Sequence, residues 1–258
     1  MADIELHGIR KVYGKSVQTV ALRGIDLTIS AGEYLAIIGR SGSGKSTLLN
    51  IIGTLDRPTS GEIRFEGKEL FAQDDDGLAL FRNSTLGFIF QFHYLLPEFN
   101  ALENVLLPYR IFHGRLNAGV IRRAKELIDR VGVGNRMYNR ANNLSGGEQQ
   151  RIAIARSLIN NPRIILADEP TGNLDSETSE AVKALLREIN REFKTTFIIV
   201  THDRHIASAC DRVIEIDDGL IKRDFKTAEF SEDENWERLA PCNCRERQRE
   251  FAPAGARS

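Results

Sequence analysis

One short stretch constrains the fold of this chain more than any other: a glycine-rich loop between a predicted strand and a predicted helix. An apolar run, residues 33–38, precedes the loop, and a helical pattern, residues 46–52, follows it. The loop fits the spacing G-x-x-x-x-G-K-[ST] and reads Gly39-Arg40-Ser41-Gly42-Ser43-Gly44-Lys45-Ser46. Because backbone amides converge on phosphate where such a loop enters a helix, the sequence predicts a nucleotide site on an α/β fold.

The residue types in this loop suit a nucleoside triphosphate. The glycines let backbone amides approach the phosphates. We expect Lys45 to reach the β- and γ-phosphates, the Ser46 hydroxyl to ligate Mg²⁺, and Thr47 to join the site from the helix start. The alternative, a glycine-rich turn with a chance lysine, is disfavoured by the flanking strand and helix.

Two further apolar runs, residues 164–167 and 197–200, predict buried strands that end in polar residues. Asp168 and Glu169 follow the first, and we expect Asp168 to hold Mg²⁺ and Glu169 to act as general base on water. His202 follows the second, at the same carboxyl edge, where it would contact the γ-phosphate or orient the water. By themselves these could be a solvated acidic pair and a structural histidine; the nearby phosphate loop favours the functional interpretation.

Two further candidate site residues have weaker support from the sequence. Gln91 follows an apolar run, residues 86–90, and its amide would reach Mg²⁺ or the attacking water; the alternative is a surface glutamine. Tyr13 precedes Gly14 near the start of the chain, and we expect its ring to stack on adenine. An ordinary packed tyrosine is the alternative there.

The sequence contains a second helix start that could bind an anion, called here the second anion socket, far along the chain from the glycine-rich loop. Leu144-Ser145-Gly146-Gly147-Glu148-Gln149 opens a predicted helix. Its buried side is supplied by Ile152, Ile154, Ala155 and Leu158. Free backbone amides and the positive dipole end make such a helix start a phosphate-binding device.

These motifs together resemble the ATP-binding cassette (ABC) ATPase family, over nearly all of residues 4–226, including the Asn173-Leu174-Asp175 stretch. The resemblance implies that Ser145, Gly146 and Gly147, with Glu148 and Asp175 as further nucleotide-binding residues, serve the ATP of a second copy. Two copies would then pack head to tail around two ATP molecules. The alternative is a glycine-rich helix cap with a purely local role.

The expected fold is α/β, a phosphate-loop NTPase of ABC type, with a mainly parallel core sheet. Alternation before the first helix and at residues 61–70 predicts a small antiparallel subdomain, and residues 92–160, including a helix over 120–131, predict an inserted helical subdomain. A helix over 178–193 would be capped by Asp175 or Ser176. The ATPase domain is expected over 1–227 and a flexible tail over 228–258, the latter with Cys242 and Cys244.

Charge and hydropathy limit the partners. The net charge of −1 gives no general attraction to nucleic acid, and no apolar run is long enough to span or insert into a membrane. The start lacks the order of a signal peptide, and the three cysteines suit a reducing compartment. Together with these limits, the resemblance to ABC ATPases implies a peripheral ATPase at the cytoplasmic face of the inner membrane, bound to separate permease subunits. The alternative is a soluble ATPase that acts in DNA repair, chromosome handling or ribosome function. Chromosome-type relatives carry a long coiled coil and ribosome-type relatives carry two cassettes, and neither feature is visible in this sequence.

Residues 86–108 and 167–176 resemble the subgroup of ABC ATPases that release lipoproteins, export macrolides or act in cell division. Residues 91–105 most resemble the lipoprotein-releasing members, so we rank lipoprotein release first, another exporter second and a division-type regulator third. The resemblance places the permease near Gln91. The expected contact residues are Phe92, His93, Tyr94, Leu95, Leu96 and Phe99, unless these pack inside the helical subdomain.

Overall fold

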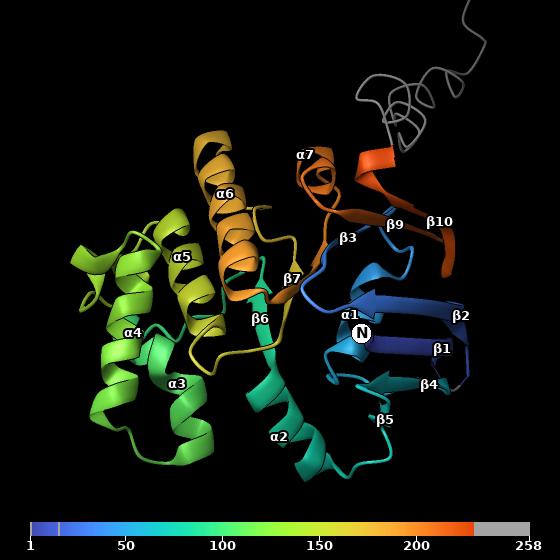
Figure 1. Ribbon diagram of the computed structural model, residues 1–258, viewed down its shortest axis with the longest axis horizontal. Helices are drawn as coiled ribbons and strands as arrows, with labels where there is room; N and C mark the ends of the chain where they lie inside the picture. Colours follow the sequence, from blue (N-terminus) through green and yellow to red (C-terminus); the bar gives the residue numbers. More distant parts are fainter. Residues whose placement is uncertain (1, 15, 230–258) are drawn as a thin grey trace, which may run out of the picture.

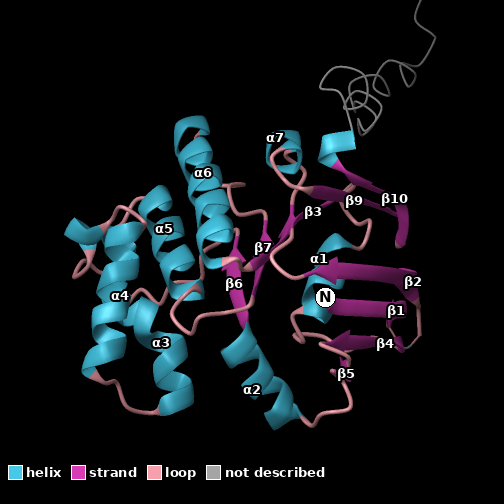
Figure 2. Cartoon of the chain, viewed as in Figure 1, coloured by secondary structure: helices cyan, strands magenta, loops and turns pink. Residues whose placement is uncertain are grey.

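The computed structural model describes residues 2–14 and 16–229. Two sheets and several helices form the molecule, with the helices between β6 and β7 on one side and a small sheet on the other (Figure 1). Figure 2 separates the helical side from the strand-rich side by colour. The predicted tail, with Cys242 and Cys244, lies outside the described residues.

The larger sheet is the predicted mainly parallel core. Its strand order is β10 (Leu220–Lys226), β9 (Arg212–Asp217), β3 (Tyr34–Ile38), β8 (Thr196–Val200), β7 (Ile164–Asp168) and β6 (Leu86–Phe90). Every neighbouring pair is parallel except β9 and β10, which form an antiparallel edge hairpin. The carboxyl ends of β6, β7, β3 and β8 therefore meet at one edge, where the polar residues after them gather.

The central strands are apolar throughout because both faces of the sheet are covered. In β3, Leu35 and Ile37 join the core on one face, whereas Tyr34 and Ala36 join the core on the other. β7 and β8 alternate in the same way between the two cores. Successive side chains of a strand point to opposite faces of the sheet, so each of these strands contributes apolar residues to both cores.

The predicted antiparallel sheet covers one face. Its order is β2 (Thr19–Ser30), β1 (Ala2–Tyr13), β4 (Ser60–Phe65) and β5 (Lys68–Glu69). Helix α1 (Lys45–Ile52) lies between the two sheets, since its Leu48 and Ile51 share one core with residues of both. Residues 61–70, whose alternation predicts part of this sheet, form β4 and β5, and Glu66 and Gly67 between them both have positive φ and form the turn.

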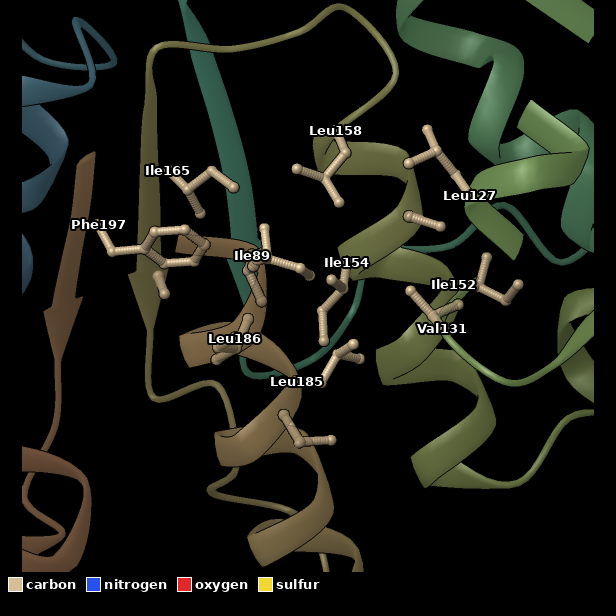
Figure 3. Packing of buried hydrophobic residues seen from close by; sticks show 14 of the residues in the cluster. Ile89, Leu127, Val131, Ile152, Ile154, Leu158, Ile165, Leu185, Leu186 and Phe197 are labelled. Carbon is tan, nitrogen blue, oxygen red and sulfur yellow. The ribbon is translucent and has the colours of Figure 1, made fainter. Parts of the chain in front are cut away.

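Helices cover the other face. They are α3 (Ala101–His113), α4 (Ala118–Arg130), α5 (Gly146–Ser157) and α6 (Ser176–Phe193). Figure 3 shows Ile154 of α5 and Leu158, the C-cap of α5, between Leu127 of α4 and the sheet residue Ile165. The four predicted buried residues of α5 and its flank are all 3% exposed or less. Two shorter helices, α2 (Asp75–Thr85) and α7 (Arg204–Ser208), and three single 3-10 turns, at Gly134–Arg136, Ala141–Asn143 and Thr227–Glu229, complete the described helical elements.

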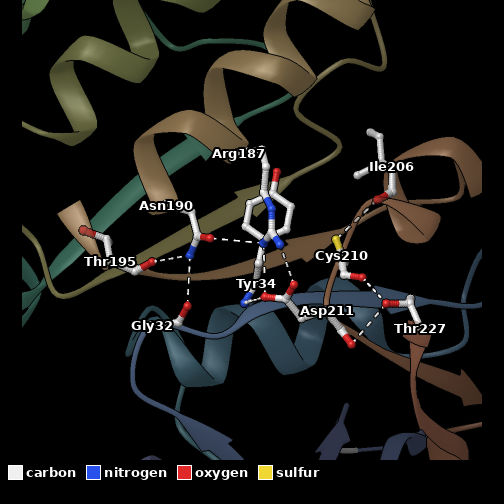
Figure 4. A network of polar contacts seen from close by, with 9 residues as sticks. All are labelled: Gly32, Tyr34, Arg187, Asn190, Thr195, Ile206, Cys210, Asp211 and Thr227. Atoms are coloured by element: carbon white, nitrogen blue, oxygen red, sulfur yellow. Dashed lines mark hydrogen bonds and ion pairs between the residues drawn. The ribbon is translucent and has the colours of Figure 1, made fainter. Parts of the chain in front are cut away.

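A polar network fixes the far end of α6 (Figure 4). The Arg187 guanidinium pairs with the Asp211 carboxylate at 2.5 Å and lies 4.8 Å from the centroid of the Tyr34 ring. The side-chain amide of Asn190 donates to the carbonyl oxygens of Gly32 at 3.0 Å and Thr195 at 2.8 Å. These contacts tie α6 to the start of β3, at the opposite end of the helix from its N-cap.

Candidate nucleotide site

The loop after β3 depends on glycine for its path. Gly39 and Gly44 have φ values of +151° and +107°, which residues with a Cβ rarely adopt. A Cβ on Gly39 would lie 2.1 Å from the carbonyl oxygen of Ile216, and one on Gly44 would lie 2.6 Å from that of Ala21. A side chain at either position would collide with backbone, so the loop requires both glycines.

Helix α1 begins without a side-chain cap. Its N-cap is Gly44, and within residues 2–14 and 16–229 no side chain accepts from its first amides as a cap. Arg40, Ser41 and Gly42 are exposed just before it, whereas Ser43 is buried and its hydroxyl has no hydrogen-bond partner in the described chain. Helix amides without a cap, at the positive end of the helix dipole, form an anion socket.

Lys45 folds back over the loop. Its Nζ donates to the carbonyl oxygens of Gly39 at 2.9 Å and Arg40 at 2.8 Å. Burial lowers the pKa of this ammonium group, and the carboxylates of Glu169 and Asp168 oppose that shift. The ammonium group is thus held beside the socket by two carbonyls that phosphate oxygens could replace.

Most of the residues predicted around the phosphates meet in one cavity of about 390 Å³, but Arg40 and Ser43 of the loop are not part of its described wall. Its wall contains Gly39, Ser41, Gly42, Gly44, Lys45, Ser46, Thr47, Gln91, Asp168, Glu169 and His202. Ala21 and Val200, which the sequence did not point to, complete it. The carboxyl edge of the larger sheet therefore brings three separate segments, which contain Gln91, Asp168 and His202, to the phosphate loop, and Ala21 joins them from β2 of the other sheet.

Asp168 ends β7 opposite Ser46. Burial raises the pKa of the Asp168 carboxyl, and the Glu169 carboxylate adds to the rise. A hydrogen bond with Ser46 and the charge of Lys45 act in the opposite direction. Ser46, Gln91 and Asp168 offer hydroxyl, amide and carboxylate oxygens, the ligand type that Mg²⁺ takes in proteins.

Glu169 has an uncommon backbone and a well-held side chain. Its φ of +47° is in the left-handed region, a conformation that costs energy for a residue other than glycine. Its N–H donates to the Val200 carbonyl at 2.9 Å. Its carboxylate contacts the His202 Nδ1 at 2.7 Å and accepts from the His202 N–H at 3.1 Å and the Thr201 hydroxyl at 3.3 Å.

His202 therefore reaches the cavity, as the sequence indicated, but one ring nitrogen is committed to Glu169. Gln91 is also restrained. Its Nε2 lies 3.3 Å from Asn173 Oδ1, and the Asn173 amide donates to the Gln91 carbonyl at 3.0 Å. The sequence assigns no role to Thr201 or Asn173; their contacts with Glu169 and Gln91 arise only in the fold.

Tyr13 lies beside the loop but is absent from the cavity wall formed by the described residues. Its hydroxyl donates to Asp56 at 2.7 Å, and the Lys11 Nζ lies 4.8 Å from its ring centroid. Burial and the Asp56 hydrogen bond raise the pKa of Tyr13, and a hydrogen bond with Thr47 lowers it. The contact with Thr47 places Tyr13 next to the first turn of α1, with its ring 41% exposed.

The second anion socket, at the start of α5, does not join this cavity: the described wall contains none of residues 144–149, called here the signature. Ser145 caps α5: its Oγ accepts from the Glu148 N–H at 3.3 Å, and the Glu148 carboxylate accepts from the Ser145 N–H at 2.8 Å. Arg136 pairs with Glu148 at 2.9 Å. Ser145 and Gly146 are exposed, and Figure 1 shows β7 between α5 and α1.

Asp175 lies on the helix start beside α5. It is the N-cap of α6, and its carboxylate accepts from the Thr178 N–H at 2.9 Å and the Thr178 hydroxyl at 2.7 Å. Ser176, the alternative cap, is instead the first residue of the helix. A Cβ on Gly147 would lie 2.6 Å from Thr178 Cγ2, so the starts of α5 and α6 touch.

The segment after Gln91 is only partly the surface that was expected. Phe92, Tyr94 and Leu96 are exposed by 66%, 63% and 40%. His93 is buried, which corrects its placement on a contact surface; Leu95 packs on the core and Phe99 is half-buried. The backbone itself causes the difference, because His93 and Tyr94 both have positive φ and their carbonyls accept from the half-buried Arg156 guanidinium at 2.6 and 2.7 Å.

A groove of about 470 Å³ runs beside this segment, between α2, β6 and α3. Its apolar lining includes Leu55, Ala79, Leu86, Phe88, Phe90, Tyr94, Leu107 and Ile111. Ile111 is 72% exposed and Leu55 is 51% exposed. An apolar hollow with exposed large side chains is typical of a protein docking surface.

Comparison with known proteins gives consistent matches. Residues 22–172 match the family described as ABC transporter. The lipoprotein-releasing system ATP-binding protein LolD of Anaeromyxobacter dehalogenans is 53% identical over 222 residues, covering 86% of this chain and 93% of that protein. The pyoverdine export ATP-binding/permease protein PvdT of Pseudomonas fluorescens is 51% identical over 223 residues, covering 86% of this chain but 34% of that protein.

Among solved structures, a dimeric post-hydrolysis state of the ATP-binding cassette MJ0796, bound to ADP and Pi, matches with a TM-score of 0.80. That chain is 42% identical, and the match covers 87% of this chain and 98% of the other.

Proposed function

The chain belongs to the ABC transporter family of ATP-binding proteins, and we propose that it powers a separate permease that releases lipoproteins from the inner membrane toward the outer membrane. Hydrolysis of ATP to power transport is the activity of this family. The choice of lipoproteins is supported by the LolD relative, which this chain matches over nearly the whole length of both proteins.

The single observation that supports hydrolysis at this site is the meeting of Lys45, Ser46, Asp168 and Glu169 in one cavity. The loop amides and Lys45 would hold the β- and γ-phosphates. Glu169 would accept a proton from the attacking water, and its contacts with His202 and Thr201 would hold the carboxylate in line. The positive φ of Glu169 costs conformational energy, and such backbone strain is typical of residues whose position is needed for function.

Ser46, Gln91 and Asp168 would hold the Mg²⁺ that accompanies ATP. When bound, the ion would neutralise charge on the phosphate oxygens. Asp168 fits this role electrostatically, because a carboxyl whose pKa is raised by burial gains from a nearby cation. Tyr13 would contact the base from beside α1, on the side where its ring is exposed.

Ser145, Gly146 and Gly147 would bind the γ-phosphate held by a second copy. The exposed start of α5 lies apart from its own cavity, and a relative with the same fold has been solved as a dimer bound to ADP and Pi. A second hollow of about 670 Å³ shares Glu169 and His202 with the cavity and would leave room for a partner there. Glu148 and Asp175 would stand at the same interface.

The permease would dock in the apolar groove between α2, β6 and α3. Residues of β6 line the groove, and Gln91, which directly follows β6, lines the cavity. A partner bound in the groove would therefore contact a strand that leads directly into the cavity. Within the described residues no helix combines the length and hydrophobicity needed to cross a bilayer. We infer that the permease holds the chain peripherally, at the cytoplasmic face of the inner membrane.

A substitution in the groove tests this docking. Ile111→Glu should leave basal ATPase activity unchanged, because Ile111 is exposed and lies outside the cavity, but should abolish copurification with the permease. Val17→Glu, at an 84% exposed apolar residue in the β1–β2 loop, is the matched control and should copurify normally. Equal retention of both variants would contradict docking at this groove.

An exporter of small molecules is the second candidate, favoured by the PvdT relative, whose printed name joins an ATP-binding part to a permease. Copurification from membranes separates the two. A Glu169→Gln chain, trapped with ATP, should bring down permease subunits together with lipoprotein. Recovery of a drug or siderophore exporter, without lipoprotein, would overturn the first proposal and leave the ATPase assignment intact.

A further inference from the structure

One buried hydrogen bond links the signature helix to the turn that contains Glu169. Gln150 lies in α5 and is 1% exposed. Its Nε2 donates to the carbonyl oxygen of Pro170 at 2.5 Å. Pro170 directly follows Glu169. The bond therefore joins α5, whose start is the second anion socket, to the turn that contains the proposed general base, although the two segments are separate along the chain.

The Glu169 turn has few other restraints on its backbone. The Glu169 N–H donates to Val200, and the Glu169 carbonyl accepts from Gly172 at 3.0 Å. Pro170 has no N–H to donate. A residue in the left-handed region stays there only when its surroundings fix it. The Gln150 amide is thus a restraint on this turn that comes from a different element.

Packing does not account for a glutamine at this position. Gln150 lies one helical turn before Ile154, on the side of α5 that meets the core. Its Oε1 is buried without a hydrogen-bond partner in the described part of the chain, which costs stability relative to an apolar side chain of similar size. The physical effect of the amide is therefore positional: it ties the turn to α5.

We infer that Gln150 is a positioning residue that couples the two nucleotide sites of the dimer. This rests on the proposed head-to-tail arrangement, in which the start of α5 meets the ATP of the second copy. Glu169 of the same chain acts on that chain's own ATP. Closure of one site on α5 then moves the Glu169 turn of the other through a single hydrogen bond, which makes hydrolysis at the two sites cooperative.

The test is Gln150→Met, which keeps the length of the side chain but removes both the donor and the unpartnered oxygen. We expect kcat to fall about 10-fold or more, as for a misplaced catalytic group, with the half-saturating ATP concentration unchanged within about 2-fold. The Hill coefficient for ATP should fall toward 1. The Tm should shift by less than about 4 °C, since the lost bond and the removed oxygen offset each other.

Asn190→Leu is the matched control. Asn190 is also a buried amide that donates to backbone carbonyls, but at the far end of α6 (Figure 4). It should lower the Tm and leave the Hill coefficient unchanged. If Asn190→Leu lowers the Hill coefficient as much as Gln150→Met does, the effect is general destabilisation and the inference is overturned.

A dimerisation assay separates this inference from the proposed function. Glu169→Gln with ATP and Mg²⁺ should sediment as a dimer, and Glu169→Gln with Gln150→Met should do the same, because the amides of Gly146 and Gly147 are untouched. If only the double variant stays monomeric, Gln150 shapes the signature socket and not the Glu169 turn. If Glu169→Gln alone stays monomeric, the shared site fails and the coupling fails with it. Unchanged kinetics of Gln150→Met, with both variants dimeric, overturns the coupling alone.

Discussion

The two helix starts that could bind phosphate, those of α1 and α5, satisfy their amides in opposite ways. The N-cap of α1 is Gly44, and in the described residues no side chain caps the helix and no acid lies in its first turn. The N-cap of α5 is Ser145, which forms a reciprocal cap in which the Ser145 and Glu148 side chains accept from each other's backbone N–H. The first start leaves its amides for a ligand, whereas the second has partly satisfied its own.

The surrounding charges follow the same division. At α1, Lys45 supplies a cation beside the socket, and Asp168 and Glu169 face it across the cavity. At α5, the acid Glu148 belongs to the helix start and is balanced by Arg136. The α1 socket is thus suited to a complete triphosphate with its cation. The α5 socket can offer a phosphate only the remaining amides and the Ser145 hydroxyl, which suits an auxiliary contact.

Removing the cation from the α1 socket should have the largest effect. Lys45→Ala should abolish ATP hydrolysis, because it removes the charge that meets the β- and γ-phosphates. The circular dichroism spectrum should stay that of the wild type. Phosphate release is the measurement, and a wild-type rate in a folded Lys45→Ala protein would contradict the role of this socket.

Blocking the α5 socket should remove hydrolysis without removing binding. Ser145→Arg places a bulky cation at the exposed start of α5, where it would prevent the second copy from closing. Nucleotide binding to the monomer, measured by fluorescence titration, should stay within about 2-fold of wild type, since binding rests on α1. Loss of monomer binding would instead place the signature in its own chain's site and erase the contrast between the two helices.

The acid facing α1 should be unfavourable for stability. Burial raises the pKa of Asp168, so the folded state binds its proton more tightly than the unfolded state does. Stability from this group is present at low pH and is lost as pH rises through the folded pKa. Asp168→Asn should therefore unfold at higher denaturant concentration than wild type at about pH 7, while losing ATPase activity. Lower stability of the variant there would contradict this reading.

The acid of the α5 cap should behave in the opposite sense. The Ser145 N–H and the Arg136 guanidinium lower the pKa of Glu148 against a smaller effect of burial. Its stabilising effect is present above the unfolded pKa of about 4.3 and is lost as pH falls through the lower folded pKa. Glu148→Gln should cost about 0.5–1 kcal/mol in urea unfolding at neutral pH. The difference from wild type should vanish in acid; a constant difference would exclude the charge as its cause.

The smallest structural effect is expected at Gly146. Its added Cβ would meet only Leu174 Cδ2, at 3.9 Å, so Gly146→Ala should change the free energy of unfolding by less than about 1 kcal/mol. Hydrolysis should nevertheless fall, because a methyl group would hold the partner's phosphate away from the helix amides. Wild-type ATPase activity in this variant would show that no phosphate approaches the helix at Gly146.

Much of the site was predictable because each of its motifs is local. Residues 33–46 specify a strand, a loop and a helix start within one short segment. Asp168 and Glu169 follow an apolar run that is readily predicted as a buried strand. Gln150 was missed, although one polar residue a turn before Ile154 on a buried helix face is a detectable signal. His93 was misplaced, since its burial depends on a left-handed backbone and on Arg156, which is far away along the chain.

The sequence by itself determined which elements form and which of them bear phosphate-binding chemistry, because periodicity, glycine spacing and capping act over a few residues. Only the tertiary structure decided which groups meet. The strand order brings Gln91, Asp168 and His202 to one cavity, and a buried amide from α5 reaches Pro170. It also decided that the start of α5 lies outside its own chain's cavity. Such pairings join residues distant in the chain, and their geometry depends on how whole layers pack, which no local pattern encodes.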